Sequence, residues 1–130
     1  MEISLRGMPD YKHPKIFADF LILYKKYYSS HKNLPKIFRV TIGAEIMREM
    51  SESMKLITLA NLKKESKEDY QEGLHYIKNL RGKIEIIKVY FLIAWEMKLI
   101  SHSFYADVLD RTEEISKQAA AWGVWFEKQK

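Results

Sequence analysis

A cluster of aromatic rings and cations near the start of the chain is the clearest chemical signal in the sequence. Its members are Tyr24, Lys25, Lys26, Tyr28 and, slightly later, Lys32. Lysine side chains can neutralise phosphate groups, and exposed tyrosine rings can stack on nucleobases. The cluster therefore predicts a nucleic-acid contact. The alternative is an ordinary amphipathic helix with half-buried tyrosines and solvated lysines.

A second pair of cations, Lys36 and Arg39, lies three residues apart and is followed four residues later by Gly43. On a regular helix this spacing puts both cations on a line that continues into the core. Arg39 could hold a phosphate or carboxylate with its planar fork, and Gly43 would leave room for a close neighbour. The alternative is an end cap, in which the aliphatic stems cover the core and the charges reach water.

Catalytic and metal-binding patterns are weak. Glu72 and His75 have the Glu-x-x-His spacing of di-iron bundles, but such sites need a second copy of the motif, and the sequence has none. No serine lies in a nucleophile elbow, no glycine-rich loop resembles a phosphate-binding fingerprint, and there is no cysteine. We therefore expect no enzyme, no metal and no cofactor. Metal analysis of the purified protein tests the one enzyme hypothesis, a carboxylate–metal site using Glu72 and His75.

The charge distribution also favours a polyanionic partner. The 130-residue chain has a net charge of +5. Residues 1–64 contain 12 Lys and Arg against 6 Asp and Glu, whereas residues 65–130 contain 10 against 11. The excess positive charge thus lies in the first half, with both cation groups. A solvated surface that keeps the protein soluble would look similar.

The elements that must position these side chains are helices. The chain has only 5 Gly and 3 Pro, too few for the many turns of an all-β fold. Apolar residues recur at steps of three and four, with Pro14 and Pro35 suited to first helical turns. We predict one all-α domain over residues 1–130, an antiparallel up-down four-helix bundle. After an irregular segment, 1–13, its helices are expected at about residues 14–31, 35–63, 67–100 and 103–127.

Each predicted helix has one line of core side chains, and Ser66 and Ser101 are expected to cap the last two helices. The third line has alternating steps of four and three, as in left-handed bundles. The four lines are Phe17, Phe20, Tyr24, Tyr27 and His31; Gly43, Met47, Met50, Met54 and Ile57, with Ile46 alongside; Gly73, Ile77, Leu80, Ile84, Ile87, Phe91, Ala94 and Lys98; and Phe104, Val108, Thr112, Ile115, Ala119, Trp122 and Phe126.

One segment has more apolar surface than a single bundle needs. Ten of the twelve residues in 84–95 are apolar, and Ile86, Tyr90 and Ile93 lie off the core line. Either neighbouring helices wrap this segment, or another subunit covers it. We predict a homo-oligomer, with these residues and the C-terminal Trp122 and Trp125 at the oligomer or partner interface.

Two features of the sequence predict that the protein does not contact a membrane. The apolar run at residues 89–95 is too short to span a bilayer. The first residues lack the apolar core of a signal peptide. We therefore expect a cytoplasmic protein.

Three parts of the chain resemble a known superfamily. The run Leu34-Pro35-Lys36-Ile37-Phe38-Arg39-Val40-Thr41-Ile42-Gly43 is similar to a motif of the Avd-like and 23S-rRNA-intervening-sequence four-helix proteins. Residues 84–101 and 105–122 also resemble these proteins. The sequence looks more like the Avd branch, the accessory variability determinants of diversity-generating retroelements.

The resemblance implies a small basic bundle that forms a homopentamer and has no catalytic activity. Such a protein would bind a retroelement reverse transcriptase and nucleic acid, either template RNA or cDNA, and would support mutagenic reverse transcription. The alternative is an intervening-sequence-type oligomer that acts as a protein-only interaction module. This chain departs from the Avd pattern in its fairly acidic second half, so a basic surface must come mostly from the first two helices.

Overall fold

The computed structural model describes residues 14–129, and this part of the chain is helical, without strands. Most of it forms four long helices: α1 (Lys15–His31), α3 (Ala44–Asn61), α4 (Lys67–Glu96) and α5 (His102–Lys128). A short helix, α2 (Lys36–Phe38), and a π-helical segment, η1 (Arg39–Gly43), lead into α3. The predicted all-α class is confirmed. The expected irregular segment 1–13 lies outside the described residues.

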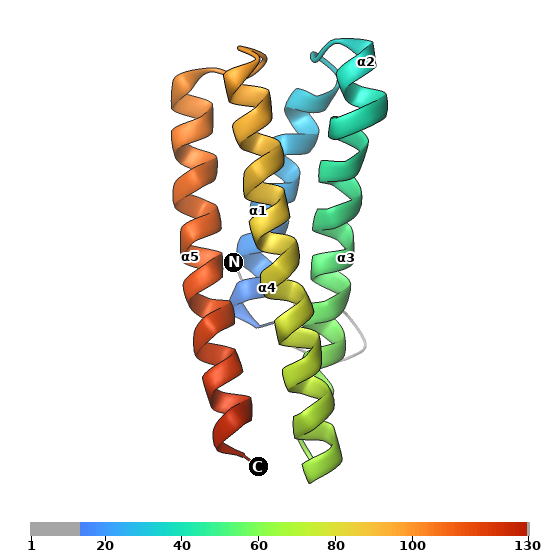
Figure 1. Ribbon diagram of the computed structural model, residues 1–130, viewed down its shortest axis with the longest axis vertical. Helices are drawn as coiled ribbons and strands as arrows, with labels where there is room; N and C mark the ends of the chain where they lie inside the picture. The colour runs from blue at the N-terminus through green and yellow to red at the C-terminus, as the bar shows by residue number, and fades with distance from the viewer. Residues whose placement is uncertain (1–13, 130) are drawn as a thin grey trace, which may run out of the picture.

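The four long helices lie side by side around one core (Figure 1). Both α1 and α4 pack against α3 and α5, so each long helix has two long neighbours. The α1–α2 and α4–α5 connections lie at the same end of the molecule, at the top of Figure 1, and the α3–α4 connection lies toward the other end. We call the first of these the upper end; residues 32–38 and 96–102 form it.

The centre of the core is the line predicted on α4. All of its members within the helix are buried, and we call them the inner seam. Apolar side chains of α1, α3 and α5 close over the seam in one continuous cluster. The inner seam consists of Gly73, Ile77, Leu80, Ile84, Ile87, Phe91 and Ala94.

The core lines of α1 and α3 are rotated from the predicted ones. On α1, Leu23 is fully buried, whereas Tyr24 is only half-buried. On α3, Ile46 is fully buried, whereas Met47 and Met54 pack at the margin. The prediction placed Tyr24, Met47 and Met54 on the core lines because they lie at steps of three and four. Long amphipathic Tyr and Met side chains can instead lie beside the core line and keep one end near water.

The two predicted serine caps are confirmed. The Ser66 hydroxyl accepts a hydrogen bond from the Asp69 backbone N–H at 3.1 Å. The Ser101 hydroxyl accepts one from the Phe104 backbone N–H, also at 3.1 Å. Each bond satisfies one of the backbone donors that a first helical turn leaves free.

The end of α4 was predicted wrongly. The helix ends at Glu96, not at residue 100, and Lys98 is exposed rather than on the inner seam. The Lys98 and Leu99 N–H groups donate to the carbonyls of Trp95 and Ala94, both at 2.9 Å. This is the Schellman arrangement, in which the residue after the cap turns left-handed. Lys98 takes that position with φ 62°.

Glycine is favoured at the Lys98 position, because a side chain in left-handed backbone costs about 1–2 kcal/mol. We expect Lys98→Gly to raise the free energy of unfolding by about 0.5–1 kcal/mol, after the greater entropy of an unfolded glycine is subtracted. Lys78→Gly, within α4, is the matched control and should lower it by about 1 kcal/mol. Urea denaturation followed by circular dichroism measures both. A destabilised Lys98→Gly protein would contradict this account of the turn.

Candidate nucleic-acid interface

Three of the cations predicted to bind nucleic acid lie without an ion-pair partner at or near the upper end of the bundle. Lys25 lies on α1, Lys32 caps the end of α1, and Lys36 begins α2. All three are exposed, and none forms an ion pair with another residue in the range 14–129. Their charges are therefore free to meet phosphate groups.

Lys26 is different from its neighbour Lys25. Its ammonium lies 2.9 Å from the Asp107 carboxylate and 4.7 Å from the centre of the Phe104 ring. Both contacts tie α1 to the start of α5. The hydrogen bonds from Lys26 and Arg111 hold the pKa of Asp107 below its ordinary value. Lys26 thus already has an anionic partner within the bundle.

The two tyrosines of the cluster also have different environments. Tyr24 is half-buried against the core, as the alternative interpretation expected. Tyr28 is 64% exposed, and its ring stacks on Tyr24 with 6.4 Å between centroids and 15° between planes. Stacking on Tyr24 therefore holds the Tyr28 ring in place, and the exposed part of the Tyr28 ring can still contact another ring.

Arg39 acts as an end cap. Its guanidinium donates a hydrogen bond to the backbone carbonyl of Lys32 at 2.9 Å, where α1 has just ended. This contact satisfies a carbonyl that the helix leaves unpaired. Of the two alternatives drawn from the sequence, the structure favours the cap for Arg39.

Lys36 and Arg39 do not lie on the core line that contains Gly43, contrary to the expectation from their spacing. The buried positions are instead Leu34, Phe38 and Gly43, at steps of four and five. The five-residue step is the π-helical turn η1. Lys36 therefore points to solvent, because the extra residue shifts the phase of the chain before Gly43.

Gly43 is needed because α1 approaches closely. A Cβ atom at this position would lie 2.8 Å from the Tyr27 hydroxyl and 2.9 Å from Cε1 of His31. These two side chains are hydrogen-bonded, with 2.9 Å between the Tyr27 hydroxyl and Nδ1 of His31. Burial raises the pKa of Tyr27 to about 12. The close approach inferred from the sequence is thus made by α1 itself.

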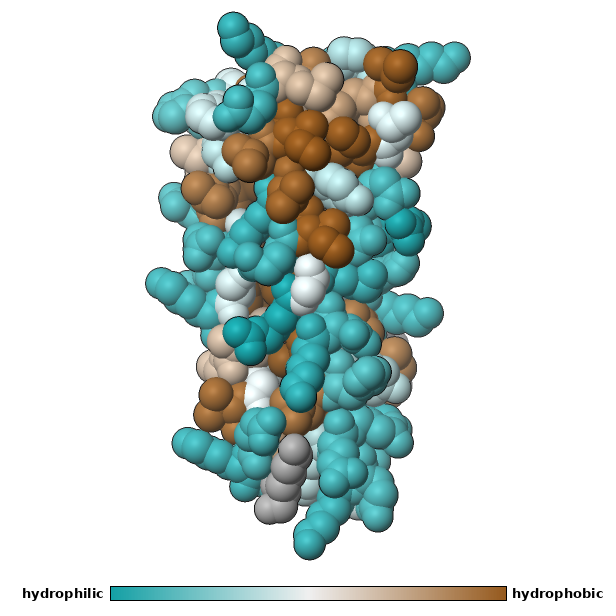
Figure 2. Space-filling model, in the orientation of Figure 1, coloured by the Kyte–Doolittle hydropathy of each residue, from teal (hydrophilic) through white to brown (hydrophobic). Residues whose placement is uncertain are grey.

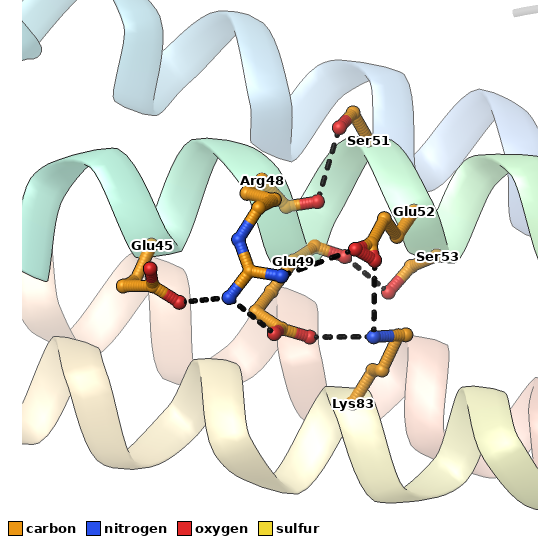
Figure 3. Close-up of polar contacts among 7 residues, drawn as sticks. All are labelled: Glu45, Arg48, Glu49, Ser51, Glu52, Ser53 and Lys83. Atoms are coloured by element: carbon orange, nitrogen blue, oxygen red, sulfur yellow. Dashed lines mark hydrogen bonds and ion pairs between the residues drawn. The ribbon is translucent and has the colours of Figure 1, made fainter.

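An ionic cluster around one buried carboxylate joins α3 to α4, and it was not predicted from the sequence (Figure 3). Glu49 is only 7% exposed, and its carboxylate lies 2.9 Å from the Lys83 ammonium and 3.6 Å from the Arg48 guanidinium. Glu52 approaches both Lys83 and Arg48, and Glu45 binds Arg48. The hydrogen bond that the Lys83 ammonium donates to Glu49 is the main reason that the pKa of Lys83 is raised above 10.5.

An apolar surface runs along the outside of α4. Ile86 and Val89 are 44% and 52% exposed, and the half-buried Ile93 continues the same side of the helix. We call these three residues the outer face. Figure 2 shows hydrophobic side chains gathered over the upper half of the view in which α4 lies in front. Neighbouring helices therefore do not wrap this segment completely.

The other predicted interface residues do not join the outer face. Tyr90 and Trp122 are half-buried and pack against the core. Trp125 is 39% exposed and meets Tyr70 edge to face, with 5.9 Å between ring centroids. Both tryptophans lie in the last two turns of α5. In Figure 1 this end of α5 lies far from the upper end. They form a separate aromatic group.

The two residues of the possible metal motif, Glu72 and His75, each contact a different neighbour. Glu72 forms an ion pair with Lys63 at 3.0 Å, and the exposed His75 lies 3.4 Å from the Asn79 amide. Among residues 14–129, no group of three or more acidic or histidine side chains could hold a metal ion. Within the same range, no helix has the length and hydrophobicity needed to cross a membrane.

Comparisons with protein-family models, with curated proteins and with solved structures gave no match to this chain. The resemblance to the Avd-like superfamily therefore stays a prediction from the sequence.

The ionic cluster predicts a large effect for Lys83→Met. This change leaves Glu49 buried without its closest cation, and breaking such a pair typically costs about 3–5 kcal/mol. Arg48 remains near Glu49, so we expect a loss of about 2–4 kcal/mol in the free energy of unfolding. Lys78→Met, an exposed change on the same helix, should alter it by less than about 0.5 kcal/mol.

The same pair predicts a pH dependence. Because the pKa of Lys83 is raised in the folded state, its contribution is complete below pH 10.5 and is lost as the pH rises through the folded pKa. Denaturation curves at increasing alkaline pH should show a smaller loss of stability for Lys83→Met than for the parent. Equal losses would show that Lys83 gains nothing from Glu49.

Proposed function

We propose that this chain is a non-catalytic accessory protein of a diversity-generating retroelement. In this proposal an antiparallel up-down four-helix bundle forms a cytoplasmic homo-oligomer. The oligomer binds a retroelement reverse transcriptase and nucleic acid, and so supports mutagenic reverse transcription. The observation that carries the nucleic-acid part is the group of three unpaired lysines, Lys25, Lys32 and Lys36, beside the exposed Tyr28.

Electrostatics support this surface. The acid that contacts α1 beside Lys25 is already engaged, since Asp107 pairs with Lys26 and Arg111. The remaining lysine charges are exposed to solvent. A nucleic acid that contacts them would release counterions from its phosphates, and this release favours binding. An oligomer would repeat the surface once per subunit, and weak contacts would add through avidity.

The reverse-transcriptase part rests on the family resemblance, and one feature of the motif fits a protein partner. Within the run 34–43, Leu34 and Phe38 are buried in the bundle. Ile37 and Val40 of the same run are 76% and 64% exposed. Exposed apolar side chains of this kind are typical of interaction sites.

Oligomerisation is supported by the outer face of α4. Burying its exposed apolar area would stabilise an assembly by about 25 cal/mol per Å². The number of five subunits comes from the resemblance alone. A second candidate function, a protein-only interaction module of the intervening-sequence type, is favoured by the same apolar surface. Retention of the partner after nuclease treatment would support that candidate.

Charge reversal at Lys25 tests the nucleic-acid surface. We expect Lys25→Glu to weaken binding to a structured RNA several-fold, and to reduce the slope of log affinity against log salt by about 0.7–0.9 per lost phosphate contact. Lys55→Glu, an exposed change on α3, is the matched control. Fluorescence anisotropy across a salt series measures both. Binding that does not weaken with salt would rule out the phosphate contacts.

Lys26→Glu should behave differently from Lys25→Glu. It places a carboxylate against Asp107, so we expect a lower melting temperature as well as weaker RNA binding. Thermal unfolding monitored by circular dichroism separates the two variants. If Lys26→Glu melts like the parent, the Lys26–Asp107 contact does not stabilise the bundle.

Valine substitutions test the assembly. Val89 and Val124 are both 52% exposed, but only Val89 lies on the outer face. We expect the parent to have several times the monomer mass of 15.5 kDa, and Val89→Lys to lower that mass. Val124→Lys should leave it unchanged. Light scattering that returns a 15.5 kDa parent at micromolar concentration would contradict the oligomer.

A further inference from the structure

An aromatic platform lies at the upper end, where α4 meets α5. The rings of Trp95 and Tyr105 are nearly parallel, with 9° between planes and 4.8 Å between centroids. Tyr105 therefore covers one face of the indole. The His102 ring is tilted by 48° at 6.0 Å from Trp95. The indole is held in position by its neighbours, as a stacking site requires.

A hollow of about 220 Å³ borders this platform, and Trp95, Glu96 and Lys98 line it. Glu96 and Lys98 are exposed, and neither forms an ion pair with another described residue. The hollow thus combines a flat ring, a free carboxylate and a free ammonium within four consecutive positions. Each of these groups recognises a different part of a nucleotide.

Lys98 adds an independent observation. It occupies the left-handed position of the Schellman turn, where glycine would fit without strain. A costly residue at such a position is a reason to look for a function of its side chain. The turn places Lys98 among the residues that line the hollow.

We propose that this hollow binds a guanine base and its phosphate. The base would stack on Trp95, the Glu96 carboxylate would accept from the base, and Lys98 would pair with the phosphate. The inference deepens the proposed nucleic-acid function and rests on it. It also adds a site formed by residues other than the lysines of α1 and α2.

The choice of guanine follows from donor geometry. Guanine presents two adjacent donors, N1–H and the N2 amino group, which a carboxylate can accept together. Uracil has one donor between two carbonyl oxygens, which would repel the carboxylate. Adenine and cytosine each have an amino group next to an acceptor nitrogen. Glu96 should therefore discriminate in favour of guanine.

Short RNAs test the site on the full chain. The probes are fluorescein-labelled pentanucleotides UUGUU, UUAUU and UUUUU, with binding measured by anisotropy. We expect UUGUU to bind at least fivefold more tightly than the other two. Unlabelled UUGUU should quench tryptophan emission in the parent. In Trp95→Phe the quenching should disappear, because Trp122 and Trp125 lie near the C-terminus of α5.

Two further variants assign the roles. Glu96→Gln should bring UUGUU to within twofold of UUUUU, whereas the control Glu65→Gln should keep the preference. Lys98→Gly should weaken all pentanucleotides several-fold and reduce the salt slope by about 0.7. Circular dichroism confirms that each variant is folded. A parent without guanine preference, or a Glu96→Gln variant that retains it, would overturn the proposal.

A further comparison distinguishes a guanine within a nucleic-acid strand from a free guanine nucleotide. If UUGUU binds at least tenfold more tightly than guanosine monophosphate, the base is presented within a strand; similar affinities would indicate a free guanine nucleotide. Structured RNA is titrated alongside. If its binding depends on Lys25 and on salt but the pentanucleotides show no preference, only the guanine site is wrong. If structured RNA does not bind either, the nucleic-acid function itself fails.

Discussion

Burial of the inner seam of α4 is the interaction on which the rest of the structure depends. The seam packs against α3 on one side and α5 on the other, and side chains of α1 complete the same cluster. Because α4 is the longest helix, its two ends set where the connecting turns can lie. The inner seam also decides which side of α4 is left outside, and so places Ile86 and Val89 on the surface.

Ion pairs then determine which charges remain available. Lys26, Arg48 and Lys83 all have carboxylate partners within the bundle. In contrast, Lys25 and Lys32 have none among the described residues. The net charge of the first half therefore overstates the number of cations free for a partner, and the second half also contains an unpaired cation, Lys98, among the described residues.

The sequence was sufficient to predict features that depend on local spacing. The inner seam follows from its steps of four and three, and the two serine caps follow from residue type. The sequence did not predict contacts between residues that are distant along the chain. No residue near Lys26 indicates that Asp107 contacts it, and Glu49 resembles any other polar residue of a helix. The end of α4 was missed because a lysine holds the turn where glycine is the usual signal. Trp95 was read only as part of a hydrophobic pattern, although its pairing with Tyr105 makes it a platform.

The π-helical turn η1 separates the orientation of α2 from that of α3. One additional residue in a turn rotates everything before it by about 100° relative to an uninterrupted α-helix. The direction in which Lys36 and Ile37 project is therefore set by the length of this segment and not by the packing of α3. Insertion or loss of a single residue between Arg39 and Gly43 would redirect Lys36 and Ile37, and it would also turn the buried Phe38 away from the core. A change in the length of this segment would therefore alter the exposed front of the motif and the packing of the upper end together.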